Sequence, residues 1–363
     1  MSPGWQNLFR ASGNSFHPDL SLICALQAEF SLGPTGEFFA QSADVQPLVS
    51  FVVPVRNDAE RLQRCLASIV ANTYARALVE IIVVDNESTD GSARVARDYG
   101  AVVITSKGQS VAAHRNRGAR VALGSIIAFA DSDHQIDRSW IEHAVSTLSD
   151  PSVAAAGAPY LAEPSANWVQ LQYDGLRHHP VAPHEVDWLG SGNFAIKRAV
   201  FDKIGGFDAT LTACEDVDLC NRIRLAGGRI IADPKLSSIH FGDPRTLKAL
   251  FLGELWRGRD NLRVTFNGPK TFAHLRSALV PVAQLGALAV AVTAALLQSW
   301  RIAAPALIVA LAPAAIRAAI ILRRRLRPTL AGAAQALAVA VVFDVARASA
   351  VLVRGSHRAR RSA

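Results

Sequence analysis

Two carboxylates stand one residue apart in the stretch IIAFADSDHQID, which covers residues 126 to 137. Asp131 and Asp133 come directly after an apolar run, and in an extended backbone their side chains would point to the same side. Carboxylate oxygens are the ligands that hard divalent cations prefer. The pair therefore predicts a metal site at the end of a strand, although the motif alone is explained equally well by a turn with two solvated acids.

A second acidic group stands in the stretch CEDVDLCNRIRLAGG, at Glu215 and Asp216. A positioned carboxylate can act as a general base and take a proton from an acceptor hydroxyl. The spacing also predicts a helix that begins here, and acids in a first helical turn stabilise the positive end of the helix dipole. For Asp216, a role as general base and a role in stabilising the helix dipole both stay open. For Glu215 and Asp218, the two roles are about equally good explanations.

The elements that must position these residues follow a repeating pattern from Leu48 onward. Short apolar runs alternate with segments whose apolar residues recur at helical spacing. The runs are VSFVVPV, EIIVVD, AVVIT and IIAFA. Strands that are apolar throughout must be covered on both faces, so the pattern predicts an α/β fold with a mainly parallel sheet between layers of helices.

Polar residues follow each of the four runs, and in sheets of this kind ligands bind beyond the carboxyl ends of the strands. These residues are Arg56, Asn57 and Asp58; Asp85, Asn86, Glu87 and Ser88; Lys107 and Gly108; and Asp131, Ser132 and Asp133. No GxGxxG motif follows the first run, and the chain contains neither GxxxxGKS nor GxxxxGKT. The sequence therefore disfavours a dinucleotide site and a P-loop.

Several further motifs resemble those of one enzyme family. They are PVRN, VVDNESTDGS, HRNRGA, FADSD, SGNFAIKR, GGFD and CEDVDLCNRIRLAGG. In order and spacing they resemble the family 2 glycosyltransferases, which have the nucleotide-sugar-binding GT-A fold, over the region from Leu48 to Arg263. The resemblance implies transfer of a sugar from a nucleotide diphosphate donor, with inversion at the anomeric carbon and with Mn²⁺ or Mg²⁺ as the cofactor.

The resemblance also implies roles for individual residues. The general base would be Asp216, and the metal ligands would be Asp131, Asp133 and His240. The residues that bind the nucleotide donor would be Arg56, Asn57, Asp85, Lys107, Arg115 and Asp131, and those that line the sugar or acceptor pocket would be Gly192, Asn193 and Glu215. For His240, packing or a local hydrogen bond is as good an explanation as a ligand role.

Arg257 and Arg259 lie in the segment WRGRDN, just before the C-terminal apolar region. Guanidinium groups suit phosphate oxygens, so these arginines are expected to reach the donor diphosphate, with contact to lipid headgroups as an equal alternative. Processive members of the family carry a QxxRW motif near this position. Its absence here favours transfer of one sugar per acceptor over a processive polysaccharide synthase.

The C-terminal part of the chain is both basic and apolar. From residue 277 onward there are eleven Lys and Arg residues and one acid, whereas the first 276 residues hold 27 basic and 29 acidic residues. The larger part is therefore nearly neutral, which disfavours nucleic acid as a partner. We expect transmembrane helices at about 277–299 and 302–322, with the arginines at 323–325 on the cytoplasmic side. A pair of buried core helices is the alternative.

A third apolar segment, 329–353, contains Asp344 and Arg347 and precedes a basic tail at 354–363. A full crossing would place that tail outside the cell, so we expect a re-entrant or interfacial helix in this membrane region, which covers 277–353. Residues 1–46 show neither sustained periodicity nor a signal peptide. They are expected to extend a glycosyltransferase domain at 47–270 that stays in the cytosol.

Together these features predict a glycosyltransferase held at the cell (inner) membrane by several C-terminal passes. The expected donor is a nucleotide-sugar, with UDP-sugars first, and membrane lipids are expected partners. The expected acceptor is a polyprenyl-linked saccharide, a glycolipid or another glycan in the synthesis of the cell envelope or an exopolysaccharide. The alternatives are a processive synthase and a membrane scaffold that binds a nucleotide-sugar without catalysis.

Overall fold

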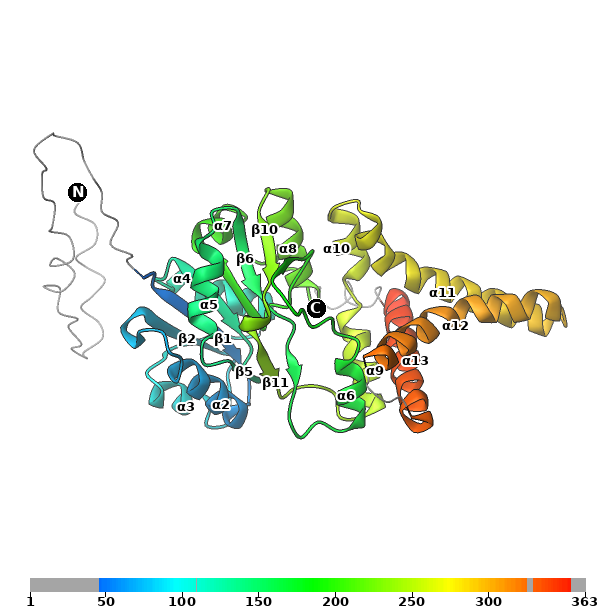
Figure 1. Ribbon diagram of the computed structural model, residues 1–363, viewed down its shortest axis with the longest axis horizontal. Coiled ribbons are helices and arrows are strands. Elements are labelled where there is room, and N and C mark those ends of the chain that lie inside the picture. The colour runs from blue at the N-terminus through cyan, green and yellow to red at the C-terminus, as the bar shows by residue number, and fades with distance from the viewer. Residues whose placement is uncertain (1–45, 109, 325–328, 354–363) are drawn as a thin grey trace, which may run out of the picture. The chain divides into compact units, whose positions relative to one another are not determined.

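The computed structural model describes residues 46–108, 110–324 and 329–353. The basic tail and all but the last residue of the expected N-terminal extension lie outside the described residues. The described chain forms an α/β domain first and three long helices last (Figure 1).

The larger sheet has eight strands in the order β3-β2-β1-β4-β9-β6-β10-β8. They are β1 (Val49–Val55), β2 (Val79–Asp85), β3 (Val102–Thr105), β4 (Ile126–Ala130), β6 (Val153–Gly157), β8 (His184–Glu185), β9 (Asn193–Lys197) and β10 (Arg229–Ala232). β1 pairs in parallel with β2 and β4, β2 with β3, and β6 with β10, whereas β9 runs antiparallel between β4 and β6. The predicted mostly parallel sheet is thus confirmed, and all four apolar runs belong to it.

Helices cover both faces of this sheet. α2 (Ala59–Val70), α3 (Ser92–Asp98) and α5 (Trp140–Ser149) pack on one face, and α4 (Val111–Val121), α7 (Arg198–Lys203) and α8 (Glu215–Leu225) pack on the other. Along β1, Phe51 and Val53 belong to the first core and Val52 to the second, and all three are fully buried. Burial on both faces is the reason why β1, β2 and β4 are largely apolar.

A second sheet of three short strands adjoins the end of β4. It consists of β5 (His134–Ile136), β11 (Ser238–His240) and β7 (Leu161–Ala162), with β11 in the middle. Between β4 and β5 the chain makes a turn in which the amide of His134 donates to the carbonyl of Asp131 at 3.0 Å. β11 runs antiparallel to β5 and pairs His240 with His134, so two histidines from distant parts of the chain lie side by side.

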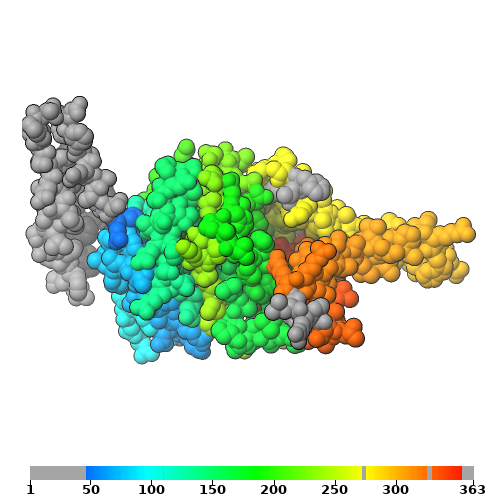
Figure 2. Space-filling view, viewed as in Figure 1, coloured from blue at the N-terminus to red at the C-terminus, as the bar shows by residue number. Residues whose placement is uncertain are grey.

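After the sheets the chain forms α9 (Leu247–Arg257), α10 (Asn261–Asn267), α11 (Phe272–Leu296), α12 (Trp300–Arg323) and α13 (Leu330–Val353). The last three each contain a stretch long and apolar enough to cross a membrane. α11 and α12 pair as a hairpin that projects from the α/β domain (Figures 1 and 2). α13 packs on α12 and also on α9 and α6 (Trp168–Asp174). The interfacial position expected for this third apolar segment stays a prediction.

Candidate functional site

A cleft of about 360 Å³ opens beyond the carboxyl ends of β1, β2 and β4. The residues that line it are Pro54, Val55, Arg56, Asn86, Val111, His114, Arg115, Asp131, Ser132 and Asp133. Four of the residues that were given a site role from the sequence therefore meet here, namely Arg56, Arg115, Asp131 and Asp133. This edge of a parallel sheet is where α/β proteins bind their ligands.

Asn57 ties together the two loops that follow β1 and β2. Its backbone amide donates to Ser88 Oγ at 2.9 Å, and its side-chain oxygen accepts from the amide of Thr89 at 2.7 Å. Asn57 and Glu87 both have positive φ angles, 50° and 51°. Such strained conformations persist only where the surroundings hold them in place. Asn57 therefore shapes the rim of the cleft and is not among the residues that line it.

Two other residues expected at the nucleotide lie at the margin of the cleft. Asp85 is 5% exposed, and its Oδ1 accepts from the amide of Ser88 at 3.1 Å. Lys107 is exposed, and its Nζ lies 3.3 Å from Glu87 Oε1. Neither belongs to the lining of the cleft, so their expected contacts with the donor stay predictions.

Arg115 joins the two acidic groups from which the sequence analysis began. From α4 it donates through Nη2 to Asp131 Oδ1 at 2.5 Å and through Nη1 to Glu215 Oε1 at 2.8 Å. Only 3% of its side chain is exposed. Burial opposes the charge of a guanidinium, and the two carboxylates compensate for it. Arg115 thus fixes the end of β4 relative to the start of α8.

Asp216 lies beside Glu215 in the first turn of α8. Burial, followed by the charge of Glu215, raises the pKa of Asp216 to about 7. A carboxylate whose pKa lies near the working pH suits a general base. The residue before the helix, Cys214, has a positive φ of 59°, so the backbone is also strained where α8 begins.

A glycine-containing loop borders both acidic groups. A β carbon added at Gly190 would lie 3.9 Å from Asp216 Oδ2, and one added at Gly192 would lie 2.6 Å from Asp131 Oδ2. Gly192 is therefore close to the strand-end acid, and its expected place in the sugar or acceptor pocket stays a prediction. The loop from Gly190 to Gly192 therefore lies near the candidate base at one end and near Asp131 at the other.

Asn193 differs from the expectation that it lines a pocket. Its Nδ2 donates to the carbonyl oxygens of Ala158 at 2.9 Å and Leu236 at 2.7 Å. Its Oδ1 accepts from Trp140 Nε1 at 2.8 Å. The amide is only 1% exposed, and core partners occupy both of its ends. Asn193 therefore supports the loop that precedes it and does not itself face the cleft.

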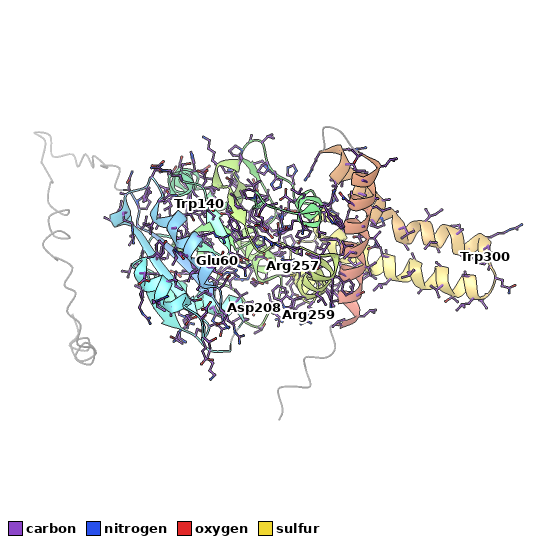
Figure 3. The ribbon with its side chains drawn as sticks, turned by 90° about the horizontal axis from the view of Figure 1, so that it is seen from below. Glu60, Trp140, Asp208, Arg257, Arg259 and Trp300 are labelled. Carbon is purple, nitrogen blue, oxygen red and sulfur yellow. The ribbon has the colours of Figure 1, made fainter. Side chains whose placement is uncertain are left out.

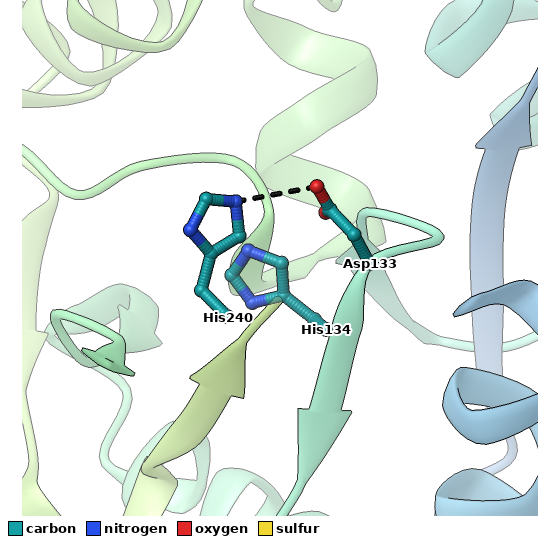
Figure 4. Close-up of side chains that lie close together, drawn as sticks. All are labelled: Asp133, His134 and His240. Carbon is teal, nitrogen blue, oxygen red and sulfur yellow. Dashed lines mark ion pairs between the residues drawn. The ribbon is translucent and has the colours of Figure 1, made fainter. Parts of the chain in front are cut away.

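Asp133, His134 and His240 bring their ligand atoms within 4.8 Å of one another (Figure 4). His240 Nε2 lies 3.3 Å from Asp133 Oδ2. A β carbon at Gly242 would lie 2.0 Å from that oxygen and 2.8 Å from His240 Nε2, so only a glycine leaves this space open. One carboxylate and two imidazoles fit a divalent ion such as Mn²⁺. Asp131 does not belong to this group, because the turn directs its carboxylate to Arg115.

The charges in this cluster are strongly perturbed. Burial, followed by the charge of His240, lowers the pKa of His134 to about 4, so its ring is neutral and suited to bind a metal. Burial opposes the charge of His240, but hydrogen bonds to Asp133 and Asp243 outweigh it and raise the pKa of His240 to about 9. The hydrogen bond and charge of His240 hold the pKa of Asp133 well below its usual range, although burial opposes this. Binding of a metal to His240 would therefore release a proton.

Arg257 and Arg259 lie near the α/β domain, at the end of the apolar hairpin away from Trp300 (Figure 3). Arg257 Nη1 donates to Glu254 Oε1 at 2.9 Å and to the hydroxyl of Tyr173 at 3.2 Å. Neither arginine belongs to the lining of the cleft. Their expected contact with the diphosphate therefore stays a prediction.

Sequence reasoning gave no individual role to three residues of this site. His134 belongs to the cluster but was not assigned a role, although it directly follows the DSD motif. Asp58 accepts from Ser132 Oγ at 3.1 Å and so holds the turn between the two acids. Asp243 accepts from His240 Nδ1 at 2.9 Å, and its place three residues after that histidine was the available signal.

Comparison with known proteins shows what the α/β domain resembles. Residues 50–213 match the family model described as glycosyl transferase family 2. The glycosyltransferase AglE of Haloferax volcanii is 30% identical over 192 residues, which cover 50% of this chain and 62% of that relative. The pre-mycofactocin glycosyltransferase of Mycobacterium tuberculosis is 35% identical over 204 residues, which cover 51% of this chain and 41% of the relative. The matched region thus spans less than two thirds of either relative.

A solved structure shows the same fold over nearly the whole length. The mannosyltransferase PcManGT of Pyrobaculum calidifontis, in complex with GDP-Man and Mn²⁺, aligns with a TM-score of 0.54 at 18% identity and with 92% of each chain covered. At this identity the likeness establishes the fold, which is the predicted GT-A arrangement. Residues 50–213 of this chain therefore match the glycosyl transferase family 2 model, and the described residues have the GT-A fold.

Proposed function

We propose that this chain is an inverting glycosyltransferase that moves a sugar from a nucleoside diphosphate to an acceptor at a membrane. The observation that carries the proposal is that the loop from Gly190 to Gly192 lies near Asp216 at one end and near Asp131 at the other. Arg115 is bonded to Asp131 and to Glu215, the neighbour of Asp216. Inversion requires the acceptor hydroxyl and the departing diphosphate on opposite faces of the sugar. A candidate base near one end of this loop, and Asp131 of the nucleotide cleft near the other end, support that requirement.

Each group has a distinct task in this proposal. The nucleotide lies in the cleft beside Arg56 and Asp131, and Asp216 takes the proton of the acceptor hydroxyl. Asp133, His134 and His240 would hold the divalent ion. When bound, such an ion acts as a Lewis acid that stabilises the negative charge of the departing diphosphate. Arg115 keeps the base helix and the strand end in register.

The donor and the acceptor are proposed at the level of chemical class. UDP-sugars are the first donors to test, and GDP-mannose is the second because PcManGT binds it. The apolar helices α11 to α13 favour an acceptor that is itself carried by a lipid, such as a polyprenyl-linked saccharide or a glycolipid. The arginine cluster at 323–325 favours the cytosolic face of the inner membrane as the site of reaction.

The test is sugar transfer by the full chain in detergent or nanodiscs, with Mn²⁺ and radiolabelled donors. Asp216→Asn removes the base, and kcat should fall about 10²- to 10⁴-fold while the KM for the donor stays unchanged. Asp218→Asn is the matched control, because it makes the same change in the same helix turn at a carboxylate that pairs with Arg222 at 2.7 Å. Equal kcat values for wild type and Asp216→Asn would contradict the assignment.

The same assay separates the alternatives. Nucleotide binding without transfer to any acceptor favours a non-catalytic scaffold, and many sugars on one acceptor favour a processive synthase. Lipid-linked and soluble acceptors are compared side by side. A chain that serves only soluble acceptors contradicts the membrane-acceptor part of the proposal.

A further inference from the structure

Arg177 is linked to His240, a residue of the candidate metal site, through Asp243. Its Nη1 donates to Asp243 Oδ2 at 2.8 Å, and its Nη2 donates to Asp243 Oδ1. The side chain of Asp243 is fully buried and accepts from His240 Nδ1 at 2.9 Å. His240 therefore faces Asp133 through Nε2, while Asp243 fixes its Nδ1. Both carboxylate oxygens of Asp243 accept hydrogen bonds from Arg177.

Aromatic rings give Arg177 a second contact with the cluster. Its guanidinium carbon lies 4.1 Å from the ring centroid of Tyr160 and 4.9 Å from that of Tyr173. The Tyr160 ring in turn packs against His134 and His240, with centroid distances of 5.0 and 4.5 Å. Displacement of Arg177 would therefore disturb both imidazoles of the cluster.

The backbone around Arg177 is held by the end of the apolar helix α12. Arg324, the residue that follows α12, donates to the carbonyl of Gly175 at 3.1 Å and to the carbonyl of Arg177. A β carbon at Gly175 would lie 3.0 Å from Ile321 Cγ2 of α12. Leu176 packs on the apolar cluster formed by α12 and α13. The position of the turn at 175–177 is therefore tied to the end of α12.

We propose that Arg177 is a positioning residue that sets the metal affinity of the site through Asp243 and His240, and that the end of α12 sets the position of Arg177. The inference rests on the metal-dependent function proposed above. A carboxylate that accepts the second N–H of a ligating histidine fixes the orientation of the ring and raises its basicity as a ligand. The two-pronged bond from a guanidinium fixes that carboxylate in turn, whereas an ammonium group cannot bind it in the same way.

The test measures Mn²⁺ binding to the full chain in detergent, with UDP or GDP present, from the electron paramagnetic resonance signal of free Mn²⁺. Arg177→Lys keeps the charge and loses the two-pronged bond, so the Mn²⁺ affinity should fall about 10- to 100-fold. Asp243→Asn keeps an oxygen that can accept from His240, but it removes the negative charge that pairs with Arg177. This variant should also bind Mn²⁺ more weakly than wild type. Arg229→Ala is the matched control, because Arg229 pairs with Glu185 at 2.9 Å at an exposed edge of the larger sheet, and its Mn²⁺ affinity should equal that of wild type.

Two further measurements distinguish positioning from a general loss of stability. In the folded Arg177→Lys protein, the Mn²⁺ concentration that gives half-maximal turnover should rise, while kcat at saturating Mn²⁺ stays close to wild type. The visible absorption bands of the Co²⁺-loaded protein should also change, because they report on the ligating imidazoles. Arg324→Ala should weaken Mn²⁺ binding in the same direction as Arg177→Lys and to a smaller extent.

Each outcome decides one part of the proposal. Arg177→Lys and Asp243→Asn proteins that bind Mn²⁺ as tightly as wild type would overturn it, and an unchanged affinity in Arg324→Ala would overturn the link to α12. A wild-type chain that binds no Mn²⁺ overturns both this proposal and the metal part of the proposed function. A wild-type chain that binds Mn²⁺ and shows these losses, yet transfers no sugar, supports the role of Arg177 and contradicts the proposed transfer.

Discussion

At the scale of single residues, two glycines determine which charged groups can meet. Gly192 gives the carboxylate of Asp131 its space, and Gly242 does the same for Asp133 and His240. A methyl group at either position would fall within contact distance of an oxygen or nitrogen that has a proposed role. These glycines are therefore required by the site itself and not by an unusual backbone conformation.

Gly242→Ala should abolish the metal site and leave the fold intact. The added β carbon would lie 2.0 Å from Asp133 Oδ2 and 2.8 Å from His240 Nε2, so the two ligands must move apart. We expect loss of Mn²⁺ binding in calorimetry and an unchanged far-ultraviolet circular dichroism spectrum. Gly91→Ala is the control, because its β carbon would make an ordinary contact of 3.8 Å with Arg94 Nη2. Normal Mn²⁺ affinity in the Gly242→Ala protein would show that the metal binds elsewhere.

The raised pKa of Asp216 should appear in the pH dependence of both stability and activity. The pKa is about 7 in the folded chain, whereas an aspartate in an unfolded chain has a pKa of about 3.9. Between these values the folded protein binds more protons, so this residue's contribution to the free energy of unfolding decreases as pH rises from about 4 to about 7. The kcat should rise over pH values near 7, because the base must lose its proton.

The measurement is the difference in stability between wild type and Asp216→Asn as a function of pH. Wild type should lose stability relative to Asp216→Asn as pH rises through this window. Asp218→Asn serves as the reference, because it makes the same substitution in the same turn of α8. A constant difference between wild type and Asp216→Asn would mean that Asp216 has an ordinary pKa.

At the scale of elements, the sequence predicted the structures that leave a periodic signature. β1, β2 and β4 are buried on both faces, and their residues are apolar for that reason. β5, β7 and β11 have three residues or fewer, which is too short for any periodicity to be recognised. The smaller sheet was therefore not predicted, although it brings His134 and His240 together.

Because the short strand β5 was not recognised in the sequence, the directions of some side chains at the site were not predicted correctly. An extended strand would have pointed Asp131 and Asp133 to one side, but the start of β5 at His134 forces a turn. The turn sends Asp131 to Arg115 and leaves Asp133 beside His240. The family resemblance implied that Asn193 lines a pocket, and only the three-dimensional structure shows that its amide oxygen accepts from Trp140 Nε1.

One ion pair should determine how firmly α13 is attached to α12. Arg317 Nε donates to Asp344 Oδ1 at 2.7 Å, and only 4% of the Asp344 side chain is exposed. Arg317→Ala leaves a buried carboxylate without its partner, which should destabilise the protein by about 3–5 kcal/mol. The double variant Arg317→Met, Asp344→Leu should recover most of this loss, because two apolar side chains replace the pair.

The measurement is the melting temperature in detergent, with Arg301→Ala at the exposed start of α12 as the control. A double variant that melts as low as Arg317→Ala would argue against the pair as the source of the effect. An Arg317→Ala variant with the same melting temperature as wild type would also argue against the pair.

At the scale of the whole molecule, α11 and α12 have the dimensions of a membrane hairpin. Their apolar stretches are 22 and 24 residues long, and 22 helical residues span about 33 Å, slightly more than the roughly 30 Å hydrocarbon core of a bilayer. Residues 297–299 join the two helices, and Gln298 makes the tight turn with a φ of 56°. Trp300 lies at the tip of the hairpin and is 67% exposed, as expected for a side chain at a membrane surface (Figure 3).

The tip of this hairpin should therefore emerge on the side of the membrane opposite to the glycosyltransferase domain. In a chain without its native cysteines, Ser299→Cys should react with a membrane-impermeant maleimide added outside intact cells, because the tip crosses to that side. Lys203→Cys, on the exposed surface of α7, should react only after the cells are permeabilised. If neither cysteine reacts before permeabilisation, the hairpin does not cross the bilayer. If Lys203→Cys alone reacts, the domain faces the other way, and a donor made in the cytosol has no access to Asp216.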